Sequence, residues 1–272
     1  MTGATGRAPL GILDSGVGGL TVMRALRAIL PHESLLYVGD TARAPYGNLS
    51  AETLRAYSRQ IIQFFLGKGV KAVVLACGSS SSTAYDTLGA EFPHLPLIDV
   101  LRPGVAEAVK IATNEPHTRM GFIATAATVN RGLFVELVKA QCPSLSICAR
   151  ACPLFAPMAE KGLFSGKLIR WAAETYLSDW RGKIDALILG CTHYPLFTDT
   201  LRHVLPQVHF IDLSESTAHH AAAQLNARAL LCPPSSPPPT HEYYVSGPPE
   251  AFNPIASLIM KEPCQARQIT WR

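Results

Sequence analysis

Two cysteines stand at matching places in the sequence, each directly after a short apolar run. Cys77 follows residues 73–76, and Cys191 follows residues 187–190. Apolar runs of this length are typical of strands buried inside a parallel sheet, and open α/β sheets bind ligands beyond the carboxyl ends of their strands. The sequence therefore predicts that both cysteines lie at sheet edges where a ligand can reach them.

Opposed thiols suit a reaction that removes a proton from one face of a carbon atom and returns a proton to the other face. One cysteine must then be a thiolate and the other a thiol, and the roles exchange with the hand of the substrate. A free cysteine has a pKa of about 8.5, which a helix N-terminus or a nearby cation lowers. Because each cysteine is expected to precede a helix, we expect a favourable dipole at both. Asp14 and His193 are polar neighbours suited to assist proton transfer.

Simpler interpretations compete with this one. A single cysteine at a strand end is usually a small buried apolar residue, and His193 taken alone is more typical of a structural histidine. Two cysteines at equivalent strand ends, each followed by polar residues, favour the catalytic interpretation. The other cysteines keep the structural interpretation; they are Cys142, Cys148, Cys152, Cys232 and Cys264. The first three lack the spacing of paired zinc ligands, so we expect no metal.

Four of the predicted strands end in polar residues, at positions 14–15, 77–82, 125–128 and 191–193. If two halves of the chain face each other, these ends line one cleft and each half supplies one cysteine. The serines at 79–82 fit either a polar loop or hydroxyls that cap a helix. The glycines at 16, 18 and 19 match neither a dinucleotide nor a phosphate-loop motif. A tight strand-to-helix turn, whose free N–H groups suit a carboxylate, is favoured there.

The elements that must position these residues alternate along the chain, which is typical of α/β layers around mainly parallel sheets. Strands are expected at 10–13, 34–38, 72–76, 96–100, 119–124, 144–149, 185–189 and 242–245. Helices are expected at about 20–30, 51–66 (with Ser50 as N-cap), 132–141, 166–180 and 254–260.

An internal repeat sets the expected domain organisation. Residues 73–77 resemble 187–191, and residues 11–14 resemble 121–124. We therefore expect two similar α/β domains with mainly parallel sheets and the active site in the cleft between them. The first domain is placed at 1–101 plus 209–272, the second at 102–208, and the proline-rich segment 232–239 is a connector.

The composition fits a folded protein and narrows its partners. Hydrophobic residues make up 48% and charged residues 16%, with a formal net charge of +4. The basic residues are scattered rather than clustered, which argues against a nucleic-acid footprint. Apolar runs fall short of the about 20 residues of a membrane span, and residues 1–9 lack the apolar core of a secretory signal. We expect a cytoplasmic protein with free thiols.

Several longer motifs resemble those of bacterial glutamate racemases, in order and over almost the whole chain. They are GILDSGVGGL at 11–20, YVGDTARAPYG at 37–47, CPLF at 152–155, Glu160, LGCTHYPL at 189–196, and YYV at 243–245 with Phe252. The resemblance implies a two-domain α/β fold and interconversion of L- and D-glutamate without a cofactor. It also implies a homodimer and a supply of D-glutamate for peptidoglycan synthesis, hence for cell-wall biogenesis and cell shape.

The resemblance also implies roles for individual residues. Cys77 and Cys191 would be the two acid/bases, assisted by Asp14, Glu160 and His193. The residues around the substrate would be Asp14, Ser15, Pro45, Tyr46, Gly47, Gly78, Ser79, Thr125, Thr128, Thr192 and His193.

One departure falls inside the expected site, where the family usually has Asn-Thr after the first cysteine and this chain has Gly78-Ser79. Gly78 lacks a side-chain amide, and a lost hydrogen bond to a charged group costs about 1.5–3 kcal/mol, tenfold or more in affinity. A smaller residue is also expected to enlarge the site. Two alternatives stay open: a racemase or epimerase of a related amino acid such as aspartate or diaminopimelate, and a weakly active relative with a binding role.

Overall fold

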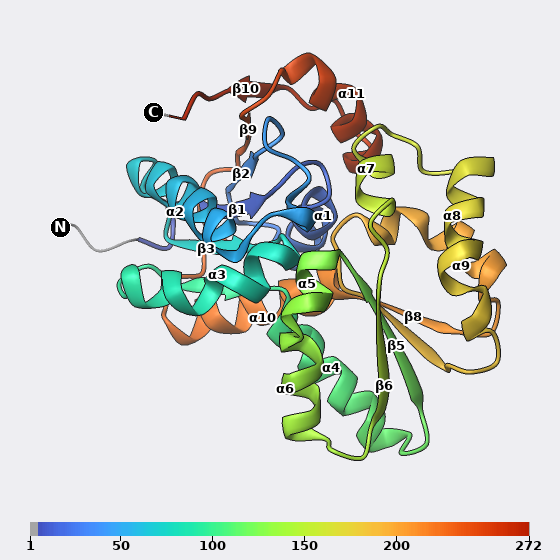
Figure 1. The fold of residues 1–272 in the computed structure, drawn as a ribbon. Helices are drawn as coiled ribbons and strands as arrows, with labels where there is room; N and C mark the ends of the chain where they lie inside the picture. The colour runs from blue at the N-terminus through green and yellow to red at the C-terminus, as the bar shows by residue number, and fades with distance from the viewer. Residues whose placement is uncertain (1–4, 272) are drawn as a thin grey trace.

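The strands of the chain form two parallel sheets. The computed structural model describes residues 5–271. The expectation that residues 1–9 contain no secretory signal falls partly outside the described residues, because residues 1–4 are not among them. Within the described residues the first sheet has the strand order β10-β9-β2-β1-β3-β4 and the second β6-β5-β7-β8 (Figure 1). The first comprises β1 (Leu10–Asp14), β2 (Leu35–Gly39), β3 (Ala72–Leu75), β4 (Leu97–Asp99), β9 (His241–Val245) and β10 (Ala266–Gln268). The second comprises β5 (Arg119–Ala124), β6 (Ser146–Ala151), β7 (Ala186–Leu189) and β8 (His209–Asp212).

The strand order confirms the expected fold class of two similar α/β halves. In the first sheet β2-β1-β3-β4 are neighbours, and β6-β5-β7-β8 repeat that order in the second. The strand before Cys77 is β3 and the strand before Cys191 is β7, and these occupy the same place in the two sheets. β9 and β10 extend the first sheet only. The resemblance between residues 11–14 and 121–124 therefore reflects corresponding central strands, β1 and β5.

Helices connect the strands and cover both faces of each sheet (Figure 1). They are α1 (Leu20–Ile29), α2 (Ala51–Gly67), α3 (Gly78–Glu91), α4 (Leu101–Asn114), α5 (Ala126–Arg131), α6 (Leu133–Gln141), α7 (Phe155–Ala159), α8 (Lys167–Leu177), α9 (Thr198–Val204), α10 (Leu213–Ala227) and α11 (Pro249–Met260). Short 3₁₀ turns lie at η1 (Tyr46–Asn48), η2 (Ser178–Trp180) and η3 (Tyr194–Phe197). Ser50 caps α2 as expected, because its hydroxyl accepts the N–H of Thr53.

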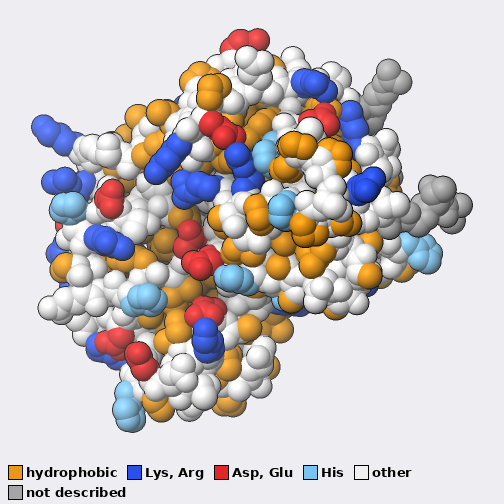
Figure 2. Space-filling view, turned by 180° about the vertical axis from the view of Figure 1, so that it is seen from behind, with side chains coloured by type: hydrophobic (Ala, Val, Ile, Leu, Met, Phe, Trp, Pro, Cys, Tyr) orange, Lys and Arg blue, Asp and Glu red, His pale blue; other side chains and the backbone are white. Residues whose placement is uncertain are grey.

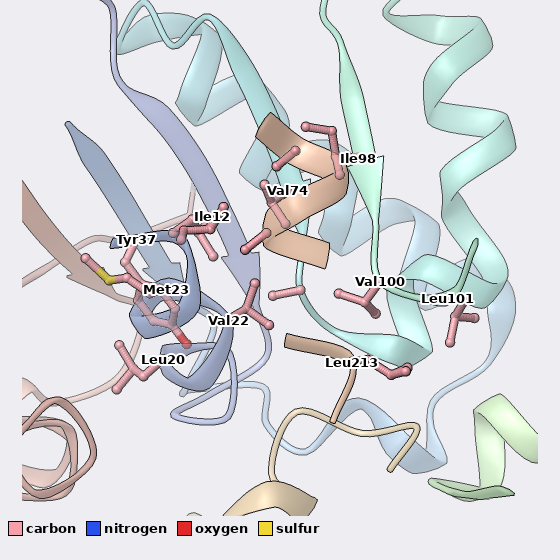
Figure 3. Close-up of a cluster of buried hydrophobic side chains, with 14 of the residues drawn as sticks. Ile12, Leu20, Val22, Met23, Tyr37, Val74, Ile98, Val100, Leu101 and Leu213 are labelled. Carbon is pink, nitrogen blue, oxygen red and sulfur yellow. The ribbon is translucent and has the colours of Figure 1, made fainter. Parts of the chain in front are cut away.

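One hydrophobic cluster runs between the two sheets and joins them. It packs Ile12 and Val74 of the first sheet against Val22 of α1, and it continues to Leu101 of α4 and Leu213 of α10 (Figure 3). The same cluster contains side chains of β5, β7 and α6 from the second sheet. Each large side chain buried in this way contributes about 1.5–3 kcal/mol. A shared core of this kind fixes the relative position of the strand ends that carry the cysteines.

The outer faces of the two sheets have separate cores. Side chains of α2 and α3 cover the outer face of the first sheet, and side chains of α7, α8 and α9 cover that of the second. The chain passes from the first sheet to the second through α4 and returns through α10, and these two helices pack together.

Several details differ from the sequence-based expectations. β8 pairs with β7, so residues 209–212, which we assigned to the first domain, belong to the second sheet. The apolar pattern of this strand is weak because only Ile211 in it is buried. Helices α4 and α10 and strand β10 were not expected. The buried face of α10 consists largely of small residues, so its periodicity is faint. The domain division at residue 101 stays a proposal.

The serines at 79–82 resolve in favour of a helix, since all four lie in the first turns of α3 and are buried. The helix expected from about residue 132 is preceded by a further short helix, α5. Gly132 separates α5 from α6 with a φ of 74°, a left-handed conformation that glycine adopts without strain.

On the surface seen in Figure 2, Lys and Arg side chains are interspersed with Asp, Glu and apolar side chains. Within the described residues no helix combines the length and the apolar character needed to cross a membrane.

Candidate active site

Both cysteines line one cavity between the two sheets. The cavity lies at the carboxyl ends of β1, β3, β5 and β7, so the four polar strand ends meet as the sequence predicts. Its lining residues are Ser15, Pro45, Tyr46, Gly47, Cys77, Gly78, Ser79, Thr125, Thr128, Ala156, Gly190, Cys191, Thr192 and His193. Of the residues assigned to the site, Asp14 and Glu160 are outside this lining. They contact the lining residues Thr192 and His193, respectively.

Cys77 is the N-cap of α3, so it precedes a helix as expected. The expected lowering of its pKa does not follow. Burial and the neighbouring charge of Asp14 raise the pKa of the Cys77 thiol to about 11, and the opposing hydrogen bond from the backbone of Ser80 is a smaller effect. The sulfur lies 3.9 Å from the hydroxyl oxygen of Ser15. At neutral pH Cys77 is therefore a protonated thiol.

Cys191 has a different environment, and the helix expected directly after it is absent. Residues 191–193 form a turn, η3 follows at Tyr194, and α9 begins only at Thr198. The neighbouring group at Cys191 is an imidazole rather than a helix N-terminus, because the sulfur of Cys191 lies 3.5 Å from Nδ1 of His193. A positively charged imidazole next to a thiol stabilises the thiolate.

His193 is held between Cys191 and Glu160. Its Nε2 lies 2.5 Å from Oε1 of Glu160, and the same carboxylate oxygen accepts the N–H of Val17 at 2.8 Å. Burial alone would lower the pKa of His193, but the hydrogen bonds and charges of Cys191 and Glu160 raise it well above its usual value. The imidazole is therefore held in its charged form beside the sulfur.

Asp14 is fully buried behind the cavity. Its Oδ1 accepts the N–H of Gly16 at 3.0 Å, and its Oδ2 accepts the hydroxyl of Thr192 at 3.2 Å. Burial raises the pKa of Asp14, while the charge of His193 acts in the opposite direction. Through Thr192 this carboxylate links the end of β1 to the residue next to Cys191. The structure thus places Asp14 beside the lining rather than in it.

Hydroxyl groups form a connected row on another wall of the cavity. The hydroxyl of Ser79 lies 2.9 Å from that of Thr125, which lies 3.1 Å from that of Thr128. Thr125 caps α5, so this row joins the start of α3 in the first half to the start of α5 in the second. These groups can bind the polar ends of a small ligand.

The segment 45–47 closes the cavity on a further side. The buried Tyr46 lines the cavity, and its hydroxyl donates a hydrogen bond to Asp40. Gly47 lies against Thr125, and a Cβ at Gly47 would come within 2.9 Å of the Cβ of Thr125. The glycine therefore allows this loop to approach the second half closely.

Two lining residues, Ala156 and Gly190, were not singled out from the sequence. Gly190 belongs to the repeated pattern of a small residue before each cysteine, so that pattern contained a usable signal. Ala156 directly follows the motif at 152–155 but has no polar group to mark it. In the described part of the chain no group of three or more His, Cys, Asp or Glu side chains is placed to hold a metal ion.

The sequence and the structure both match one family. The family model for Asp/Glu/hydantoin racemases matches residues 20–231. A glutamate racemase of Thermus thermophilus is 40% identical over 253 residues, 93% of each chain. One from Streptococcus equi is 34% identical over 263 residues, 96% of this chain and 98% of that one. The crystal structure of the Francisella tularensis glutamate racemase in complex with D-glutamate has a TM-score of 0.89 at 32% identity and covers 98% of both chains. The chain belongs to the Asp/Glu/hydantoin racemase family.

Proposed function

We propose that this protein is a glutamate racemase, which interconverts L- and D-glutamate without a cofactor and uses Cys77 and Cys191 as its two acid/bases. The observation that carries the proposal is the pair of cysteines, which come from corresponding strands of the two halves and line one cavity. The similarity to glutamate racemases over more than nine tenths of the chain supports glutamate as the substrate.

In the proposed reaction one thiolate takes the α-proton of the amino acid and becomes a thiol. The electron pair of the broken C–H bond moves into the α-carboxylate as an enediolate-like charge. The opposite thiol then gives its proton to the other face of the α-carbon and becomes a thiolate, so the proton count balances. In the resting form Cys77 is the thiol, and the sulfur of Cys191 lies beside the imidazole of His193.

Hydrogen-bond donors around the cavity are suited to hold the carboxylates of the substrate. The N–H groups at the start of a helix lack partners within the helix, and α3 presents those of Gly78 and Ser79 at the cavity. The hydroxyls of Ser79, Thr125 and Thr128 add further donors. Anions bind well at helix N-termini for this reason.

We further propose that the D-glutamate made here serves peptidoglycan synthesis in the cytoplasm and that the protein acts as a homodimer. Supporting the dimer, Leu168 and Trp171 lie one turn apart on α8 and are 55% and 57% exposed. Large apolar side chains exposed together mark surfaces that bind other proteins. Light scattering on the purified protein measures the mass of the particle directly.

The activity is tested by incubating the purified protein with L-glutamate in D₂O. We expect the α-proton signal to disappear from the NMR spectrum and the circular dichroism of the solution to decay to zero. The variant Cys148→Ala is the control, since Cys148 is exposed on β6 and outside the cavity, and it should behave as the wild type. Unchanged α-proton and dichroism signals would contradict the proposal.

Gly78 was the reason to consider another amino acid as substrate. The expected enlargement of the site there is wrong, because the space of a side chain at residue 78 is taken by the carbonyl oxygen of Gly190. The same assay with aspartate and with diaminopimelate decides between the substrates, and a faster reaction with either one would replace glutamate. Inactivity on all of them would favour the weakly active relative with a binding role.

A further inference from the structure

Gly78 makes an unusual contact across the cavity. A Cβ built on Gly78 would lie 2.6 Å from the carbonyl oxygen of Gly190, which is closer than real Cβ contacts allow. Gly78 directly follows Cys77, and Gly190 directly precedes Cys191. The two residues that adjoin the cysteines are therefore in contact, and nothing larger than a hydrogen atom fits between them.

Other glycines of the first half also lie against the second half, but there the contacting atoms belong to side chains. A Cβ on Gly18 would meet the hydroxyl of Thr192 at 2.4 Å, and a Cβ on Gly47 would meet Thr125 at 2.9 Å. A side chain can yield by rotating about its own bonds. A backbone carbonyl such as that of Gly190 can yield only if its strand end moves.

The end of β7 has little freedom to move. The N–H of Gly190 donates to the carbonyl of Ile123 on β5 at 2.8 Å. A Cβ on Gly190 would come within 2.2 Å of the ring of Phe122, and that ring is stacked on Phe134 with centroids 4.2 Å apart. Close packing of this kind resists displacement.

The opposite partner is fixed as well. The N–H of Ala76 donates to the carbonyl of Leu13 at 2.8 Å, and the carbonyl of Cys77 accepts the N–H of Ser81 as the first hydrogen bond of α3. Gly78 is thus held by both the sheet and the helix. A side chain at this position must separate the two strand ends, because neither backbone can turn away.

We propose that Gly78 is a positioning residue, whose missing side chain sets the distance between Cys77 and Cys191 across the substrate. The inference rests on the proposed function and deepens it. Residue 78 does not bind substrate through a side chain in this protein. Its missing side chain allows the backbones of the two halves to approach each other closely beside the two cysteines. Asparagine, which the family usually has here, does not fit this geometry and should lower activity.

The test compares Gly78→Ala with Gly89→Ala. Gly89 lies in the same helix with nothing within 4 Å of its Cβ position, so it is a matched control. Alanine has a higher helix propensity than glycine, so neither change should unfold α3. We expect kcat of Gly78→Ala to fall by about 100-fold, the loss associated with a displacement of about 1 Å in a catalytic group. Gly89→Ala should keep the kcat of the wild type, and Gly78→Asn should lose at least as much as Gly78→Ala.

A readout specific to positioning is the ratio of α-proton exchange to inversion, measured in D₂O by NMR and circular dichroism. When the second thiol is too distant, the intermediate is reprotonated from the side on which it lost its proton, so exchange without inversion increases in Gly78→Ala. A merely less stable protein would lose both processes equally. Wild-type kcat and an unchanged ratio in Gly78→Ala would overturn the proposal.

Crystal structures of the wild type and of Gly78→Ala separate this inference from the proposed function. We expect a larger separation between the sulfurs of Cys77 and Cys191 in the variant, whatever amino acid the protein accepts. If the separation is unchanged, the positioning role is wrong even where the racemase activity stands. If the wild type is inert with glutamate but the separation grows, only the substrate assignment fails.

Discussion

The ends of β3 and β7 hold the same place in their sheets and present opposite surroundings to their cysteines. Cys77 lies beside a carboxylate, Asp14, and a hydroxyl, Ser15. Cys191 lies beside an imidazole, His193, which is paired with the carboxylate of Glu160. The two cysteines are similarly buried, at 6% and 8% exposed, so burial alone cannot distinguish them. Their neighbours do, since a negative charge favours a thiol and a positive charge favours a thiolate.

The repeated strands place the two cysteines at corresponding positions. The residues in the neighbouring loops then give the two sulfurs different electrostatic surroundings. A two-base reaction needs one proton shared between two thiols, and identical surroundings would leave its location undecided. Burial and the charge of Asp14 raise the pKa of Cys77 to about 11, which keeps the proton there at neutral pH. Cys191 instead lies next to the imidazole of His193.

The largest expected effect comes from removing either sulfur. Cys77→Ala and Cys191→Ala should each lose racemisation by about 10³-fold or more, within the range of a general acid or base. Each variant keeps one base, so any residual α-proton exchange should be limited to one enantiomer, and to opposite enantiomers in the two variants. Separate incubations with L- and D-glutamate in D₂O, followed by NMR, measure this.

The buried Cys152 provides the control for these variants. It is fully buried next to the site and outside the cavity lining, so Cys152→Ala should keep racemisation. Exchange of the same enantiomer by both variants would show that the sulfurs do not face opposite sides of the α-carbon.

The sequence predicts the positions of the two cysteines, but it does not predict the surroundings of their sulfurs. The apolar runs before Cys77 and Cys191 predict the strands correctly, because a parallel strand that is buried on both faces consists almost entirely of apolar residues. The surroundings of each sulfur depend on loops whose positions the local pattern does not contain. The helix expected after Cys191 is replaced by a turn, and the cavity expected to be enlarged at Gly78 is filled by Gly190.

Similar reasoning applies to the elements that were missed. Helix α10 packs through residues such as Ala218 and Ala221, which produce little contrast between apolar and polar faces. Strand β8 is recognisable only through its pairing with β7. Contacts between distant segments decided both, and a single sequence does not display them.

A smaller effect is expected from changing the residues that support Cys191 while keeping both sulfurs. His193→Asn removes the cation beside the sulfur and should lower kcat by about 100-fold. Glu160→Gln keeps the imidazole but removes the carboxylate that raises the pKa of His193, so we expect a loss of about tenfold. The imidazolium then loses its proton at lower pH, and the alkaline limb of the kcat profile should move to lower pH.

The profile of Glu160→Gln distinguishes a positioning role from a structural one. A destabilised protein would lose activity at every pH without moving the limb. The charges of Asp14 and His193 also act on each other, but the main groups that raise the pKa of His193 are Cys191 and Glu160. Asp14→Asn should therefore move the alkaline limb less than Glu160→Gln does. An equal shift in both variants would show that Glu160 has no special role in holding the charge of His193.

The smallest expected effect is the change that Asp14→Asn makes in the alkylation rate of Cys77. With a pKa of about 11, roughly one Cys77 in a thousand is a thiolate at pH 8, and only the thiolate reacts. Iodoacetamide should therefore modify Cys191 before Cys77, as followed by mass spectrometry of the peptides. Asp14→Asn removes the second largest contribution to the raised pKa of Cys77 but leaves burial unchanged. Cys77 should then react less than about tenfold faster and still after Cys191, whereas faster alkylation of Cys77 in the wild type would reverse the assignment of the resting thiol.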